Sequence, residues 1–171
     1  MDIFDIKKSL ENITILYDTR EQQTEKLKRR LEQMEVDAER VKLDYGDYSI
    51  KCPLSDGQEF DFSNKCVVER KMSIDELAMC LGTERDRFER EFKRAQEDNC
   101  KIYLLIEDAT WEKIFNHKYR SKMTPFSIVA SLFAWIPRYN MIPIFCKSET
   151  SGKIIKEILY RELKEYLENE Q

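Results

Sequence analysis

The sequence is organised around the stretch Val67-Val68-Glu69-Arg70-Lys71, in which an apolar run ends in three charged residues. A short apolar run of this kind predicts a buried strand, over residues 66–70. Because side chains alternate between the two faces of a strand, Glu69 and Lys71 are expected on one face and Arg70 on the other. The strand thus presents a carboxylate and an ammonium group together.

A second acid stands earlier, in Gly46-Asp47-Tyr48. Asp47 directly follows a glycine turn and precedes a strand predicted over residues 48–52, so it can approach Glu69 across the sheet. Carboxylate oxygens suit Mg²⁺ or Mn²⁺, and such a cation polarises a phosphate and lowers the pKa of water. The ammonium group of Lys71 can hold the attacking water or offset the growing charge. This constellation indicates phosphodiester hydrolysis. A solvated strand edge is the alternative, because such a trio also arises by chance in a chain that is 36% charged.

The segments around these two strands alternate between strand and helix patterns. Further strands are predicted over residues 13–17, 38–43, 59–62, 101–106 and 141–146. Helices are predicted over residues 22–34, from an N-cap at Ser73 to a break near Gly82, and over residues 84–98, 125–136 and 151–167. Ser73 and Glu76 have the spacing of a capping box. The alternation predicts an α/β fold with a mixed sheet flanked by helices.

Length and composition set the class of protein. A chain of 171 residues favours a single domain over residues 1–171, with a core of about 13–146 and a C-terminal helix of about 151–168. Hydrophobic residues make up 42%, which favours a folded chain. No apolar run reaches the roughly 18 residues of a membrane span, and the charged first ten residues do not resemble a signal peptide. Five cysteines without a CxxC pair favour a reducing, cytoplasmic compartment (nuclear in a eukaryote) over a disulfide framework or a zinc site.

The wider pattern Gly46-Asp47…Glu69-Arg70-Lys71-x-x-x-Asp75 resembles the GD…ERKxxxD signature of the XPF-type structure-specific endonucleases. Tyr17-Asp18-Thr19-Arg20-Glu21 is similar to the family's opening D-x-R-E element. The stretch Asp86-Arg87-Phe88-Glu89-Arg90-Glu91 is similar to its G-R-[FL]-x-x-Q stretch, with Asp in place of Gly and Glu91 in place of Gln. The resemblance covers residues 13–144 and implies a restriction-endonuclease-like, or PD-(D/E)xK, core. Typical members also carry helix-hairpin-helix elements or a helicase, and this sequence shows neither, so we expect the stand-alone form of the nuclease domain.

The resemblance implies a metal site and a lysine beside it. Asp47 and Glu69 would bind Mg²⁺ or Mn²⁺, and Asp18 would be a further acid at the metal, directly or through water. Lys71 would orient or activate the nucleophilic water. Taken alone, Asp18 is also explained as a turn former at the end of a strand.

Two further residues of the signature are less clearly catalytic. Asp75 would hold Lys71 or a water at the ion, or would simply be a favourable acid near a helix N-terminus. The strand parity of Arg70 points it away from the metal, so it would hold a carboxylate of the fold or touch DNA. Gly46 is expected to supply a turn that a side chain would obstruct.

Cations are unevenly placed, although the net charge is −4. Phosphate binding depends on where cations lie and not on their sum. One predicted helix face could meet DNA phosphates or pair with nearby acids; it carries Arg87, Arg90 and Arg94. A polar segment without acids, residues 113–122, is predicted to be a DNA-contacting loop and includes Lys118, Arg120 and Lys122.

These patterns lead to one main hypothesis and two rivals. The first is a Mg²⁺- or Mn²⁺-dependent DNA endonuclease that cuts duplex or branched DNA. The second is a catalytically inactive binding module of the same fold that recruits another DNA-processing protein, and the third is an RNA-directed nuclease. The apolar residues of the helix predicted over residues 125–136 are expected to pack in the core. The family resemblance gives a homodimer face as the alternative, at Ile128, Leu132, Phe133 and Ile136. No membrane partner is expected.

Overall fold

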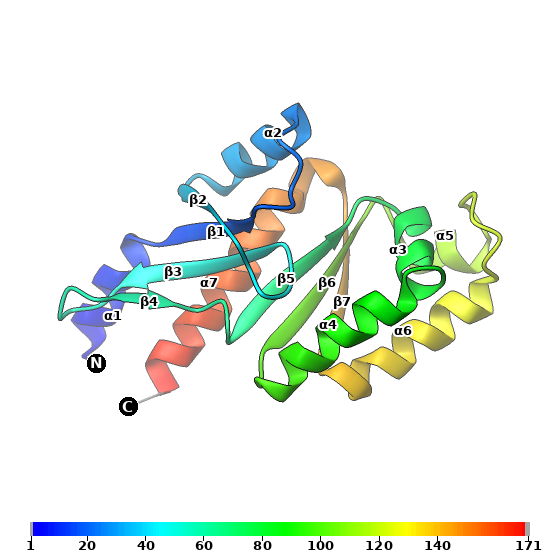
Figure 1. Cartoon of the computed structure of the whole chain (residues 1–171). Coiled ribbons are helices and arrows are strands. Elements are labelled where there is room, and N and C mark those ends of the chain that lie inside the picture. The colour runs from blue at the N-terminus through cyan, green and yellow to red at the C-terminus, as the bar shows by residue number, and fades with distance from the viewer. Residues whose placement is uncertain (1, 170–171) are drawn as a thin grey trace.

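The computed structural model describes residues 2–169, which form one mixed sheet covered by helices on both faces (Figure 1). Residues 1, 170 and 171, at the ends of the predicted domain, lie outside the described residues. The strands are β1 (Thr14–Asp18), β2 (Asp37–Val41), β3 (Tyr48–Pro53), β4 (Glu59–Asp61), β5 (Cys66–Lys71), β6 (Lys101–Glu107) and β7 (Met141–Cys146). The helices are α1 (Ile3–Glu11), α2 (Glu25–Met34), α3 (Ile74–Leu81), α4 (Arg85–Glu97), α5 (Trp111–Phe115), α6 (Pro125–Tyr139) and α7 (Ser151–Asn169), with a short 3₁₀ turn at Ser148–Thr150.

The order of strands places β5 in the middle of the sheet. The order is β2-β1-β3-β5-β6-β7, and β4 pairs with β3 outside this path. β5 is parallel to β6, β6 is parallel to β7, and β3 runs antiparallel to both β1 and β5. Tyr48 of β3 pairs with Val68 of β5, so the residue before β3 lies beside the carboxyl end of β5. Ligands of α/β sheets commonly bind at the carboxyl ends of strands.

Two apolar clusters hold the layers together, one on each face of the sheet. Residues of α3, α4, α5 and α6 pack on one face, around the fully buried Trp135, Phe92 and Leu104. Residues of α1, α2 and α7 pack on the other, around Ile15, Ile50 and Leu159. Alternating strand residues therefore serve different cores, as shown by Val67 in the first cluster and Val68 in the second.

Most predicted elements are confirmed, and the mixed α/β architecture with them. Ser73 caps α3 by accepting a hydrogen bond from Glu76 N, as predicted, whereas the Glu76 side chain accepts from Met72 N and not from Ser73 N. The predicted helix over residues 22–34 begins later, because Thr24 caps it and accepts from Leu27 N. Pro125 starts α6 as predicted, but the helix continues through Pro137 to Tyr139.

Two helices were not predicted. α1 buries Ile6 and Leu10 against the cluster that contains α7, and its remaining residues are largely exposed. α5 has five residues and is capped by Thr110, within a region predicted to be mainly loop. No helix in residues 2–169 combines the length and apolar character that crossing a membrane requires.

Candidate active site

Backbone hydrogen bonds and one glycine fix the position of Asp47. Its N–H donates to Val68 O and its carbonyl accepts from Asp18 N, each at 2.9 Å, so it bridges β5 and β1. Gly46 has φ +71°, and a Cβ there would lie 2.7 Å from the Val67 Cβ atom. Both the backbone conformation and the space therefore require glycine, which confirms the structural role predicted for Gly46.

Glu69 and Lys71 lie on the same face of β5, as the alternation predicts. Both are 4% exposed, and the Lys71 Nζ atom lies 2.5 Å from Glu69 Oε1. The same ammonium group lies 4.0 Å from the centroid of the Phe88 ring on α4. Burial lowers the pKa of Lys71, but the charges of Glu69 and Asp47 outweigh burial and raise it. The lysine is therefore a fixed positive charge at neutral pH.

Asp47 differs from Glu69 in its hydrogen bonds and ion pairs. Its Oδ2 atom accepts from Arg70 N at 2.7 Å, and its carboxylate makes no ion pair within residues 2–169. Burial and the charge of Glu69 raise the pKa of Asp47 well above its usual value. Burial also raises the pKa of Glu69, against the opposing effect of Lys71. The two carboxyl groups thus bring more negative charge together than their surroundings neutralise.

The donor set fits a hard divalent cation, although the third predicted acid points elsewhere. Asp47 and Glu69 supply carboxylate oxygens of the kind that Mg²⁺ and Mn²⁺ prefer. Within residues 2–169, no group of three or more His, Cys, Asp or Glu side chains is placed to hold a metal ion. The Oδ1 atom of Asp18 accepts from Arg20 N and Nε, at 2.7 and 2.6 Å, and its Oδ2 accepts from Leu43 N at 2.7 Å. Asp18 therefore organises a turn beside the site.

Two residues that were not predicted as site residues hold the Gly46 turn. Glu91, which is 7% exposed, accepts from Gly46 N at 2.9 Å. Arg20 donates to Gly46 O at 3.3 Å, and one of its nitrogens lies 3.7 Å from the carboxylate of Glu91. The motif comparison marks Glu91 as a substitution for Gln, and its contact with Gly46 explains why a hydrogen-bond acceptor is needed there.

Arg70 lies on the opposite face, in a buried network of charges. Its guanidinium group donates to Glu107 at 3.1 Å and lies 3.9 Å from Glu21. Arg30 of α2 approaches the same two carboxylates, each at 3.4 Å, and donates to Tyr48 Oη at 3.0 Å. Of the two roles left open for Arg70, holding a carboxylate of the fold is therefore the one observed. Arg30 was missed by sequence reasoning, although it falls on the apolar face of α2 between Leu27 and Met34.

Asp75 contacts a loop and not Lys71. Its Oδ1 atom accepts from Arg120 N at 2.8 Å and from Ser121 N at 2.7 Å. The Arg120 side chain is 94% exposed and lies 3.6 Å from the Asp75 carboxylate. Because α3 follows β5 directly, this contact fixes the predicted DNA-contacting loop to the helix that follows β5.

The predicted phosphate-binding cations are exposed but differ in their contacts. Arg87 forms an ion pair with Glu84 at 2.7 Å, as expected from the alternative interpretation that these arginines pair with nearby acids. Arg94 lines a cavity near Arg20, and Arg90 is exposed on the same helix. Lys118 and Lys122 are also exposed, on the loop between α5 and α6.

The helix proposed for a dimer face buries most of the residues expected there. Ile128 and Leu132 are fully buried in this chain's own core, so they do not form an exposed face, and Ile136 is partly buried against it. Phe133 is 56% exposed and Phe126 is 80% exposed. Of the four predicted positions, Phe133 is the exposed one. Phe126, on the same helix, is a further exposed apolar residue.

Comparisons with known proteins support the fold. Two solved structures are similar: XPF from Aeropyrum pernix, with a TM-score of 0.60 and 20% identity over 85% of this chain and 64% of that chain, and the same protein in complex with DNA, with a TM-score of 0.61 and 21% identity over 86% and 63%. The chain therefore spans less than two thirds of these structures. It has the restriction-endonuclease-like fold of the XPF nuclease domain, as predicted. A search among curated proteins found no match.

The family assignment comes from sequence and covers the whole candidate site. The profile of the ERCC4 domain matches residues 17–158, from the end of β1 to the middle of α7. This range includes Asp47, Glu69 and Lys71 together with the turn that holds them. The chain belongs to the ERCC4 domain family.

Proposed function

We propose that this protein is a DNA endonuclease that depends on Mg²⁺ or Mn²⁺ and cuts duplex or branched DNA. One observation carries the proposal: the half-buried carboxylate of Asp47 makes no ion pair within residues 2–169, and burial together with the charge of Glu69 raises its pKa. An uncompensated buried charge is costly for a fold, and functional sites are where proteins retain such costs. A divalent cation shared by the two carboxylates would remove it.

Family membership and fold support the nucleic-acid substrate. The chain belongs to the ERCC4 domain family, and one of the similar structures is XPF from Aeropyrum pernix in complex with DNA. Exposed cations lie at Arg90 and Arg94 of α4 and on the loop that Asp75 holds. Such cations supply the affinity for phosphates that a chain of net charge −4 lacks overall.

The residues of the site would have separate roles in hydrolysis. When bound, Mg²⁺ or Mn²⁺ would supply Lewis-acid activation of the phosphate and a lowered pKa for water. Asp47 and Glu69 would hold it, and the Gly46 turn keeps Asp47 in place. Asp18 lies beside this turn, and its predicted role at the metal remains a proposal that requires release from Leu43 N.

Lys71 acts through its positive charge. Because Glu69 and Asp47 raise its pKa despite burial, the ammonium group is protonated and does not serve as a general base. It instead donates hydrogen bonds to the attacking water or to the phosphate as negative charge develops. Replacement by methionine would remove this charge while keeping an extended apolar side chain under the Phe88 ring.

A cleavage assay tests the proposal. Labelled linear duplex, flap, fork and four-way-junction DNA are incubated with the protein in Mn²⁺, in Mg²⁺ and in EDTA. We expect cutting of at least one substrate in either metal and none in EDTA. Asp47→Asn and Glu69→Gln keep the size of each side chain and are expected to lower the cleavage rate by a factor of about 10² or more, a typical loss for an essential electrostatic group.

The controls separate the rival interpretations. Glu97→Gln, on the exposed end of α4, should cut like wild type. Failure to cut any substrate while still binding DNA would favour the inactive binding module. Preferential cutting of a matched RNA hairpin would favour the RNA-directed nuclease.

A further inference from the structure

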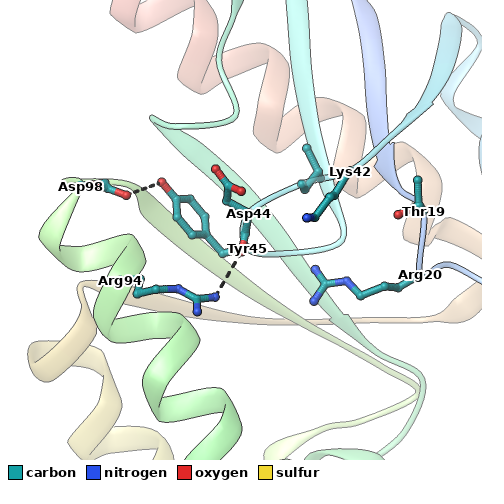
Figure 2. Close-up of a pocket in the computed structure, with 8 residues that line it drawn as sticks. Thr19, Arg20, Lys42, Asp44, Tyr45, Arg94 and Asp98 are labelled. Atoms are coloured by element: carbon teal, nitrogen blue, oxygen red, sulfur yellow. Dashed lines mark hydrogen bonds between the residues drawn. The ribbon is translucent and has the colours of Figure 1, made fainter.

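A cavity of about 570 Å³ lies next to the candidate active site and has no role in the chemistry described above. It opens between the segment that joins β2 to β3 and the C-terminal half of α4 (Figure 2). Arg20 forms one wall and also contacts Gly46 O and Asp18, so it is shared by the cavity and the site. A molecule in the cavity would therefore lie beside the Gly46 turn that carries Asp47.

The cavity is locally cationic in a chain that is acidic overall. Arg20, Lys42 and Arg94 line it, against the carboxylates of Asp44 and Asp98. Asp98 accepts a hydrogen bond from the Tyr45 hydroxyl at 3.1 Å, which partly satisfies its charge. Figure 2 shows the guanidinium groups of Arg20 and Arg94 pointing toward one another, while the Asp44 carboxylate points away from both.

Two of the three cations have hydrogen-bonding capacity to spare. Within residues 2–169, the Lys42 ammonium group makes neither a hydrogen bond nor an ion pair. Arg94 makes one long hydrogen bond, to the Asp44 carbonyl at 3.4 Å, and no ion pair with a described residue. By contrast, Arg87 on the same helix is paired with Glu84 at 2.7 Å. These donors are therefore available to an anionic ligand in the cavity.

We propose that this cavity binds backbone phosphate of the DNA strand next to the phosphate that is cut, with Lys42 and Arg94 as its phosphate contacts. The inference rests on the proposed function and adds a substrate-positioning site to it. The shared wall at Arg20 favours a continuous strand over a separate anionic molecule. The volume falls within the roughly 300–1,000 Å³ of sites that hold a small ligand, so a nucleotide unit fits.

Backbone contacts of this kind position a strand without reading its sequence. Removal of one such phosphate contact should weaken binding equally for different DNA sequences and reduce the salt dependence of the affinity. Each phosphate contact contributes a slope of about −0.9 in log K against log salt, which corresponds to roughly eightfold in affinity at about 0.1 M salt.

The test measures the affinity of the full chain for a fluorescein-labelled flap duplex at several salt concentrations, with Ca²⁺ in place of Mg²⁺. We expect Lys42→Ala and Arg94→Ala each to weaken binding by roughly eightfold and to lower the salt slope by about one. Lys42→Arg should keep the wild-type slope. The matched control is Lys93→Ala: Lys93 is exposed, adjacent to Arg94 on α4 and 3.9 Å from Glu97, and its loss should leave affinity within twofold.

Failure of this inference differs from failure of the proposed function. If wild type binds and cuts the flap while Lys42→Ala and Arg94→Ala keep its affinity and slope, the cavity does not hold the strand. If wild type neither binds nor cuts any DNA, the proposed function fails first. Circular dichroism of each variant checks that its fold is intact.

Discussion

The two faces of β5 carry charged side chains that differ in how fully they are neutralised. On the face toward α2, Arg30 and Arg70 meet Glu21 and Glu107, so two cations oppose two carboxylates. On the face toward α4, Lys71 pairs with Glu69, and Asp47 has no ion pair with a described residue.

The difference supports separate roles for the two faces: Arg70 serves the fold, whereas Glu69 and Lys71 are the residues proposed for the chemistry, although all three belong to one short signature. Removal of any residue from a balanced buried network destabilises the fold, because it leaves a charged partner unpaired. An unbalanced group is instead poised to take up a cation. The following predictions test this contrast, starting with the largest effect.

The largest effect is expected from breaking the balanced face. Arg30→Met leaves Glu21 and Glu107 with one cation between them, and should lower the free energy of unfolding by about 3–5 kcal/mol. Urea denaturation measures the loss. Arg29→Met, an exposed position on the same helix, is the control and should change stability by less than about 0.5 kcal/mol. Equal effects at the two positions would contradict a structural role for the network.

The next effect concerns the turn that connects the two faces. Gly46→Ala places a methyl group 2.7 Å from Val67 Cβ and should cost about 1–3 kcal/mol of stability by overpacking. It should also abolish cleavage, because Asp47 is displaced. Gly57 has a similar positive φ but nothing within 4 Å of an added Cβ. Gly57→Ala therefore measures backbone strain alone, and a loss as large as that of Gly46→Ala would exclude the clash as the cause.

Replacing Asp47, on the face of β5 toward α4, is expected to change stability by a smaller amount and in the opposite direction. The pKa of Asp47 is higher in the folded protein than in the unfolded chain, so without metal its contribution to stability falls as pH rises through the folded value. Asp47→Asn removes this loss and should raise the stability of the metal-free protein near neutral pH, by about 1 kcal/mol. Its stability should also depend less on pH than that of wild type. A destabilised variant with an unchanged pH profile would show that Asp47 is not under electrostatic stress.

The smallest effect concerns Asp75, which the signature groups with the catalytic residues. The structure assigns its hydrogen bonds to Arg120 N and Ser121 N, so Asp75→Ala should cost about 1 kcal/mol or less. Faster amide hydrogen exchange should be confined to this loop. Altered titration of Lys71, observed by NMR, would instead support the signature-based role.

Sequence patterns predicted the strands well, and also which side chains of β5 share a face, for a physical reason. Alternation along β5 fixes which side chains share a face, and the glycine before Asp47 marks the turn, so both are local signals. The ends of elements were less accurate where a cap decided them, as Thr24 does for α2.

What the sequence did not predict depends on contacts between distant segments. Asp18 is held by Leu43 N, and Glu91 by Gly46 N, across 25 and 45 positions. The burial of Arg30 depends on Glu21 of the segment after β1, on Glu107 of β6 and on Ser151 of α7. The cavity beside Lys42 likewise exists only once α4 packs against the segment after β2.

The most direct test of the central claim is a calorimetric titration of Mn²⁺ into the metal-free protein, compared with Asp47→Asn and Glu69→Gln. We expect wild type to bind Mn²⁺ more tightly as the pH rises, since the ion binds ionised carboxylates and the pKa values of both groups are raised. Each variant should bind at least about tenfold more weakly. Undiminished Mn²⁺ binding by both variants, or no binding by wild type, would contradict a cation shared by Asp47 and Glu69.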